Sequence, residues 1–240
     1  MAVDNSDTKA LLHMNGSGTT FTDESGKTWT AAGNAQISSA QSVFGGASGL
    51  FDGTTDYIST AQHADFNLVG LTTWTFDWRG RFTALPANGS KFMLWSHGDS
   101  LTHCTVIEIF NNAGTYVVVV EVVNGSSEVA YGAVTITTNT WYAFSTVRNG
   151  DDYLFFLNGT RVATFNNSAL DYENYTAGPR IGAHIDNGFS HNGYYDEFRF
   201  SRVARQTGAS YTVPTSEYAP LAASLLANER AKLNQDMLVR

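Results

Sequence analysis

Hydrophobic and polar residues alternate with a period of two through the middle of the chain. In the run Trp74-Thr-Phe-Asp-Trp-Arg-Gly-Arg-Phe82, positions 74, 76, 78 and 82 face one way, and positions 75, 77, 79 and 81 face the other. This period is typical of a β-strand with one buried side. We therefore expect a strand at 74–82 whose aromatic residues are buried and whose other side is wet.

Further strands follow the same pattern, and tight turns separate them. The β-branched run 116–123 ends at Asn124-Gly125, a dipeptide that favours a hairpin turn. The runs 141–147, 153–157 and 161–165 are joined by two more Asn-Gly pairs, which predicts a three-stranded meander. Roughly a dozen short strands with turn signals between them favour two packed antiparallel sheets.

The pattern changes near Pro214. Residues 221–238 are rich in helix-forming residues, and Pro220 is well placed to begin a helix. We expect a flexible leader at 1–8, a β-sandwich at 9–213, and a linker with a short C-terminal helix at 214–240. Unless the helix is frayed, its apolar residues are expected to pack on their own domain or to dock a partner or a second copy of the chain: Leu221, Leu225, Leu226, Leu233 and Met237.

Composition narrows the classes of function. The 240 residues are 42% hydrophobic, enough for the core of one sandwich domain. The net charge is −8 and the few lysines are scattered, which argues against a nucleic-acid partner. No apolar run is long enough for a membrane helix, and the polar N-terminus does not suggest an export signal. The single cysteine, Cys104, excludes an intrachain disulfide.

Three segments of the chain resemble laminin-G-like, concanavalin A-like modules. These segments are Phe51-Asp-Gly-Thr-Thr-Asp-Tyr-Ile58, the meander from Trp141 to Val162, and Gly193-Tyr-Tyr-Asp-Glu-Phe-Arg-Phe-Ser-Arg-Val-Ala-Arg205. The resemblance implies an all-β fold, a two-sheet antiparallel jelly-roll sandwich. It also implies that Asp196 has a structural role, as a paired or hydrogen-bonded carboxylate or as a contact of bound Ca²⁺. Asp52 and Asp56 are the further candidates for such a calcium site.

The N-terminal part of the chain resembles a narrower group of these modules. The segments 11–26 and 35–53 resemble versions of the module found in tailed-phage and prophage virion proteins. This resemblance implies a non-catalytic structural module of a phage tail, fibre or capsid decoration. Such a protein is located in the virion, is made in the host cytoplasm without a signal peptide, and attaches to other virion proteins or to copies of itself. The alternative is a lectin-like, carbohydrate-binding module of a bacterial protein.

Nothing in the sequence predicts catalysis. The E-x-D-x-x-E pattern of glucanases is missing, and Glu108 and Glu121 each stand alone in a strand. There is also no H-E-x-x-H or G-x-S-x-G motif, so a glycoside hydrolase is the least expected function. Glycan binding needs an exposed aromatic ring with polar neighbours. The candidate residues, taken from three polar segments, are Trp95, His97, Asp99, His103, Tyr175 and Asn187.

Overall fold

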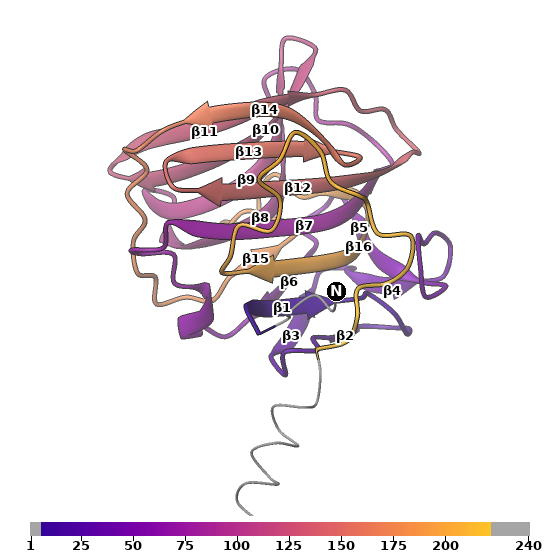
Figure 1. Cartoon of the computed structure of the whole chain (residues 1–240). Coiled ribbons are helices and arrows are strands. Elements are labelled where there is room, and N and C mark those ends of the chain that lie inside the picture. Colours follow the sequence, from indigo (N-terminus) through magenta and orange to yellow (C-terminus); the bar gives the residue numbers. More distant parts are fainter. Residues whose placement is uncertain (1–5, 222–240) are drawn as a thin grey trace, which may run out of the picture.

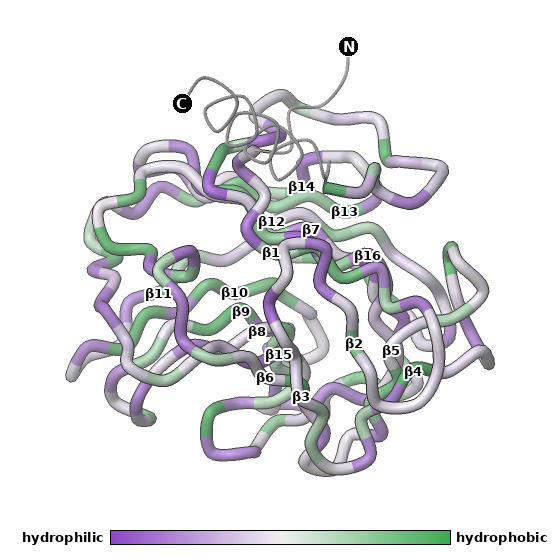
Figure 2. The backbone as a smooth tube through the Cα atoms, turned by 90° about the horizontal axis from the view of Figure 1, so that it is seen from below, coloured by the Kyte–Doolittle hydropathy of each residue, from purple (hydrophilic) through white to green (hydrophobic). Residues whose placement is uncertain are grey.

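A computed structural model describes residues 6–221 as two antiparallel β-sheets packed face to face (Figures 1 and 2). Within these residues the one helical element is a short 3₁₀ turn, η1, at Ala64–Phe66. No helix in this part of the chain is long and apolar enough to cross a membrane. The predicted all-β sandwich is therefore confirmed.

The first sheet, sheet A, has β7 and β16 at its centre. In spatial order its strands are β14 (Thr160–Asn166), β13 (Asp152–Leu157), β12 (Trp141–Asn149), β7 (Thr73–Phe82), β16 (Asn192–Ser201), β5 (Ser48–Asp52) and β4 (Gln36–Ser38), with β1 (Thr8–Leu12) also paired to β16. β5 pairs with the first half of β16 and β1 with the second half, on either side of a bulge after Asp196.

The second sheet, sheet B, is ordered from a long edge strand to a short one. Its strands are β11 (Ser126–Val134), β10 (Thr115–Asn124), β9 (His103–Asn112), β8 (Lys91–Ser100), β15 (Arg180–Ile181), β6 (Tyr57–Thr60), β3 (Thr28–Ala32) and β2 (Thr20–Thr22). Figure 2 colours much of β9 and β10 as hydrophobic, in line with the β-branched run in the sequence.

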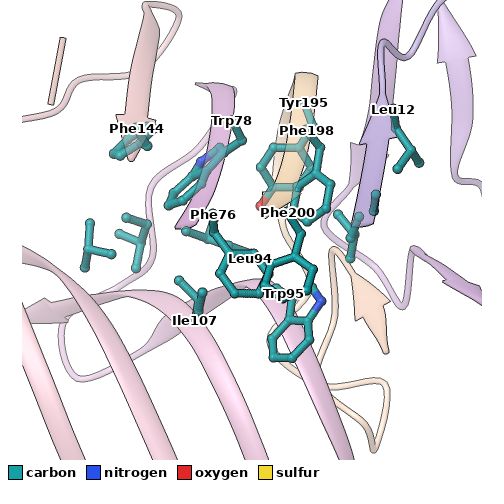
Figure 3. Close-up of a cluster of buried hydrophobic side chains, with 14 of the residues drawn as sticks. Leu12, Phe76, Trp78, Leu94, Trp95, Ile107, Phe144, Tyr195, Phe198 and Phe200 are labelled. Carbon is teal, nitrogen blue, oxygen red and sulfur yellow. The ribbon is translucent and has the colours of Figure 1, made fainter. Parts of the chain in front are cut away.

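The core lies between the sheets and is rich in aromatic rings (Figure 3). Trp74, Phe76 and Trp78 are all nearly inaccessible to solvent, so they share one buried side of β7 as expected. Phe76 packs against Trp95 of the opposite sheet, with 4.9 Å between ring centroids. Burying a large apolar side chain contributes roughly 1.5–3 kcal/mol, so these contacts dominate the stability of the sandwich.

The predicted meander is confirmed as β12, β13 and β14 in that order. Leu157 pairs with Thr160 across the second turn, where Asn158 and Gly159 have φ angles of 50° and 82°. Asparagine and glycine tolerate this left-handed conformation better than other residues, so the sequence specifies this hairpin directly.

The prediction that one side of β7 is exposed to solvent is wrong for Thr75 and Asp77. Thr75 and Asp77 are as buried as the aromatic residues between them, because residues 202–221 pass over the outer face of sheet A (Figure 1). Thr75 Oγ1 donates to Val203 O at 2.7 Å and accepts from Arg205 N at 3.0 Å. Farther along, Arg161 N donates to Ala209 O. Sheet A is thus buried on both faces along this path.

A buried ion pair lies under this segment. Asp77 Oδ2 accepts hydrogen bonds from Arg199 Nε at 3.1 Å and from Arg199 Nη2 at 2.7 Å. Tyr218 lies over the Arg199 guanidinium at 3.8 Å, and its backbone N–H donates to Glu197 at 2.7 Å. Two guanidinium donors on one carboxylate oxygen, a third donor from Gln206 on the other oxygen, and a stacked ring offset the cost of burying both charges.

The ends of the predicted domain differ in detail from the structure. β1 begins at Thr8, inside the predicted leader. Residues 214–221 belong to the predicted linker, but they lie against the sandwich, where Asn15 Nδ2 donates to Glu217 Oε1 at 2.7 Å. Leu221 is half-buried at the end of the described chain. The rest of the predicted helix, with Leu225, Leu226, Leu233 and Met237, lies outside the described residues.

A buried histidine makes the fold sensitive to acid. His191 is fully buried, stacked on Tyr195 at 4.0 Å, and its burial lowers its pKa to about 3. It stays neutral in the folded protein, whereas the unfolded chain binds a proton below about pH 6.5. Its contribution to stability is therefore present above pH 6.5 and is lost as the pH falls toward 3, by about 1.4 kcal/mol per pH unit.

We expect His191→Phe to remove this part of the acid sensitivity, because phenylalanine fits the same aromatic surroundings and does not titrate. Between pH 7 and pH 4.5, urea unfolding of the wild type should lose about 2–3 kcal/mol more than the variant. His103→Phe, at an exposed site, is the control. Equal losses in the wild type and in His191→Phe would contradict the assignment.

Candidate functional site

Trp95, predicted as an exposed stacking platform, is part of the core. Its side chain is only 1% exposed. A β-bulge interrupts the pairing of β8 with β9 between Met93 and Trp95, so both Leu94 and Trp95 belong to the core cluster. The prediction that Trp95 stacks on a ligand is therefore wrong, because a bulge in a central strand turned the ring inward.

His97 and Tyr175 are also buried and have internal partners. His97 Nε2 lies 3.0 Å from both Gln62 Oε1 and Ala177 O, and burial lowers its pKa to about 4. The Tyr175 hydroxyl lies 2.9 Å from Thr105 Oγ1, and its ring packs edge-on against His97 at 4.8 Å. Both residues join the loop before β15 to the sheet, so neither presents an open face to a ligand.

The remaining predicted sugar-binding residues are partly brought together. Asp99, His103 and the edge of Tyr175 line one shallow hollow of about 490 Å³ at the end of β8. Asp99 already accepts backbone N–H groups from Thr176 and Ala177. Asn187 lies in a different loop and accepts a hydrogen bond from Arg180 at 2.7 Å. The six residues therefore do not form one site.

The three candidate calcium ligands, Asp52, Asp56 and Asp196, all accept hydrogen bonds within the protein. Both carboxylate oxygens of Asp56 accept backbone N–H groups, from Asn34 and Asp52. Asp196 Oδ2 accepts from the backbone N–H groups of Val43 and Phe44, and burial raises the pKa of Asp196 to about 7. Within residues 6–221 no three His, Cys, Asp or Glu side chains gather into a group that could hold a metal ion. Asp196 is hydrogen-bonded to the loop that it holds.

A groove that the sequence did not indicate lies on the outer face of sheet B. It has a volume of about 480 Å³ and crosses β8, β9, β10 and β11. Eleven residues line it: Gly89, Lys91, Glu108, Phe110, Asn112, Val117, Val119, Glu121, Val129, Tyr131 and Phe189.

Strand register builds the floor of this groove. Val117 is opposite Phe110, and Val119 is opposite Glu108, so alternate residues of β9 and β10 face outward together. The other alternate residues, such as Ile109 and Val118, are in the core. Because both sets are largely apolar, these two strands have a hydrophobic outer face as well as a hydrophobic inner face.

Three charged side chains meet at one side of the floor. Lys91 Nζ lies 2.8 Å from Glu108 Oε2 and 3.3 Å from Glu121 Oε2. The contact with Glu108 is a close ion pair. Ser127 Oγ donates to the other oxygen of Glu121. One ammonium group thus holds two carboxylates from neighbouring strands.

Burial decides the protonation of this cluster. It raises the pKa of Glu108 to about 7, although Lys91 acts in the opposite direction. For Lys91, burial acts to lower the pKa, but Glu108 and Glu121 raise it overall. Near neutral pH the lysine is charged and Glu108 is about half protonated. The groove therefore offers both donors and acceptors of hydrogen bonds.

Two exposed aromatic rings border the groove. The Tyr131 side chain on β11 is 48% exposed and lies 4.8 Å from the Phe165 ring. Phe189, 45% exposed, belongs to the loop between β15 and β16, and Lys91 Nζ lies 5.4 Å from its ring. The Phe189 carbonyl accepts from Met93 N at 2.8 Å, which fixes this loop on β8.

The sequence contains a signal for the charged cluster, namely the short turn between two strands that each carry one glutamate. A short turn after Asn112 joins β9 to β10 and sets their register. This register places Glu108 opposite Val119 and Glu121 opposite Val106, two positions along the same outward face. Pairing the two strands around the turn would have brought the carboxylates together. Tyr131 and Phe189 had no comparable signal, because their places depend on the edge strand and on a long loop.

No protein-family model matches this chain, and no curated protein matches it. Solved structures do match. Domain 4 of AbnA, an extracellular GH43 arabinanase from Geobacillus stearothermophilus in complex with arabinotriose, is 15% identical, with a TM-score of 0.62 over 82% of this chain and 93% of that one. The binding domain of Paraclostridial Mosquitocidal Protein 1 is 14% identical, with a TM-score of 0.62 over 83% of this chain and 50% of that one.

A third match is the binding domain of botulinum neurotoxin DC in complex with SialylT. It is 14% identical, with a TM-score of 0.61 over 84% of this chain and 49% of that one. This chain spans about half the length of the two toxin domains. At these identities the similarity shows the fold, a β-sandwich shared with binding domains.

We expect Lys91→Met to destabilise the protein more at pH 8 than at pH 5. At pH 8 the variant leaves buried Glu108 without its counter-charge, at a cost of about 1–3 kcal/mol. At pH 5 Glu108 is protonated in both proteins, so the cost is smaller. Urea unfolding at both pH values measures the difference.

Adding Glu108→Gln to the Lys91 variant should recover most of the loss at pH 8, because the amide needs no counter-charge. A loss of the same size at both pH values, with no recovery in the double variant, would show that Lys91 acts through packing alone.

Proposed function

We propose that this chain is a non-catalytic carbohydrate-binding domain that takes a saccharide into the groove on the outer face of sheet B. The observation that carries the proposal is the pair of exposed rings, Tyr131 and Phe189, beside the Lys91–Glu108–Glu121 cluster. Aromatic faces stack on the apolar faces of sugar rings, and charged groups hydrogen-bond their hydroxyls. The valine floor excludes water beneath such a ligand.

The matched structures support a binding role of this kind. The arabinanase domain is recorded with arabinotriose, and the neurotoxin domain with SialylT. Both are described as domains or binding domains of larger proteins. The arabinanase domain is aligned over nearly its whole length, so a sandwich of this size occurs as a domain that holds an oligosaccharide.

The charged cluster favours binding over hydrolysis. A retaining glycosidase needs one carboxyl group as acid and a second, free carboxylate as nucleophile. Here Lys91 Nζ contacts both Glu108 and Glu121, so neither carboxylate is free of a counter-charge. This arrangement suits a fixed polar surface for a ligand.

The virion role expected from the N-terminal segments has no support from the comparisons. They favour the alternative, a lectin-like module, although attachment within a virion stays a prediction. A glycan-binding groove would serve a phage particle and a bacterial surface protein equally well. The experiments below therefore test glycan binding in the groove, which both alternatives share.

We expect Tyr131→Ala and Phe189→Ala each to weaken saccharide binding at least about tenfold, or ~1.4 kcal/mol, because each removes a stacking surface. A glycan array with the wild-type chain selects the saccharide, and titration calorimetry measures the affinity of each variant.

Val162→Ala is the control for this experiment. Val162 is 40% exposed on β14, outside the groove, so its removal should leave affinity unchanged. Thermal unfolding of each variant checks that the fold is intact. Full affinity in both aromatic variants would rule out the groove as the binding site.

A further inference from the structure

A second cluster of aromatic and basic side chains lies on sheet A, the sheet opposite the groove. Strand register places Trp141 of β12 opposite Arg81 of β7, and places Arg81 opposite Tyr194 of β16. The three residues therefore form one row across three neighbouring strands, which lie about 4.8 Å apart in such a sheet.

This row faces outward. The neighbouring residue on β16, Tyr195, and the one on β7, Phe82, are both in the core, so Tyr194 and Arg81 point to the other side. All three members of the row are half-buried. The rings of Trp141 and Tyr194 are 6.4 Å apart, and the Arg81 guanidinium lies 5.6 Å from the Tyr194 ring.

Arg81 differs from the other arginines of the described chain. Within residues 6–221 its guanidinium has no hydrogen bond and no ion pair. The other seven arginines in this range each donate at least one hydrogen bond from the side chain: Arg79, Arg148, Arg161, Arg180, Arg199, Arg202 and Arg205. The guanidinium lies near the Tyr194 ring, and within residues 6–221 its five N–H donors have no hydrogen-bond acceptor.

A guanidinium whose N–H groups have no acceptor within residues 6–221 is suited to bind a planar anion. Arginine binds a carboxylate through two parallel hydrogen bonds, and the flanking rings lower the local dielectric, which strengthens such a contact. The whole chain carries a net charge of −8, yet no carboxylate of residues 6–221 is within ion-pairing distance of Arg81. The site is therefore complementary to a negative group supplied from outside.

We propose that the Trp141–Arg81–Tyr194 cluster is a second binding site, specific for an acidic saccharide. The carboxylate of a uronic acid pairs with Arg81, and the apolar face of its ring packs on Trp141. This site goes beyond the proposed function, because it lies on the opposite sheet and takes a different class of sugar.

The two sites separate sugars by charge. The groove on sheet B presents Glu108 and Glu121, which repel a carboxylate, although Lys91 offsets part of their charge. The cluster on sheet A presents one unpaired positive charge. Acidic residues of a glycan are therefore directed to sheet A, and neutral residues to sheet B.

Titration calorimetry with a trimer of galacturonic acid, and with the neutral galactose trimer as the matched probe, tests this proposal. We expect the acidic trimer to bind the wild-type chain, and Arg81→Gln and Trp141→Ala each to weaken that binding at least tenfold. Arg81→Lys should give an intermediate loss, because it keeps the charge without the bidentate geometry. Arg161→Gln, on β14, is the matched control and should bind as the wild type does.

The groove variant Tyr131→Ala distinguishes this proposal from the proposed function. It should leave binding of the acidic trimer unchanged, even where it abolishes binding of the array-selected saccharide. The proposal is overturned if the neutral trimer binds as tightly as the acidic one, if Arg81→Gln retains full affinity with an unchanged melting temperature, or if Tyr131→Ala removes binding of the acidic trimer. A poly-glutamate peptide that binds with equal affinity would also overturn it, since the partner would then be an acidic protein segment.

Discussion

The packing of two aromatic sheet faces against each other is the constraint on which the rest of this structure depends. Phe76 and Phe200 of sheet A stack at 4.6 Å, and Phe76 meets Trp95 of sheet B at 4.9 Å. Rings of this size bury a large apolar area and prefer offset or tilted contacts, which fix the separation and alignment of the sheets. Every strand that contributes to this layer must then present its alternate residues outward.

The outer faces of the two sheets differ in how far other segments of the chain cover them. Residues 202–221 cover sheet A, where Tyr211 packs on Phe156 and the Asp77–Arg199 pair is buried. Sheet B is crossed by the loop that carries Phe189, and the groove remains open beside it. The segment 202–221 thus takes up much of the outer face of sheet A, and the row of Trp141, Arg81 and Tyr194 crosses the same sheet at β12, β7 and β16.

Two β-bulges, one in β8 and one in β16, decide which side chains face the core. The bulge after Met93 sends Trp95 into the core, while Lys91 and Met93 keep the outward side of β8. Likewise, the bulge in β16 follows Asp196, whose carboxylate holds the backbone of the loop at Val43 and Phe44. Both bulges reassign a side chain from one face to the other, which is a known use of this feature.

The sequence by itself determined the fold class and the hairpins. Strand periodicity and the Asn-Gly turns are local properties, and the aromatic residues at 74, 76 and 78 have no economical burial except between two sheets. Only the tertiary structure decided which faces stayed open. A bulge buried Trp95, a segment more than a hundred residues away covered Asp77, and strand register joined Glu108 to Glu121. These outcomes depend on contacts between distant parts of the chain, and a local pattern of hydrophobic residues does not specify such contacts.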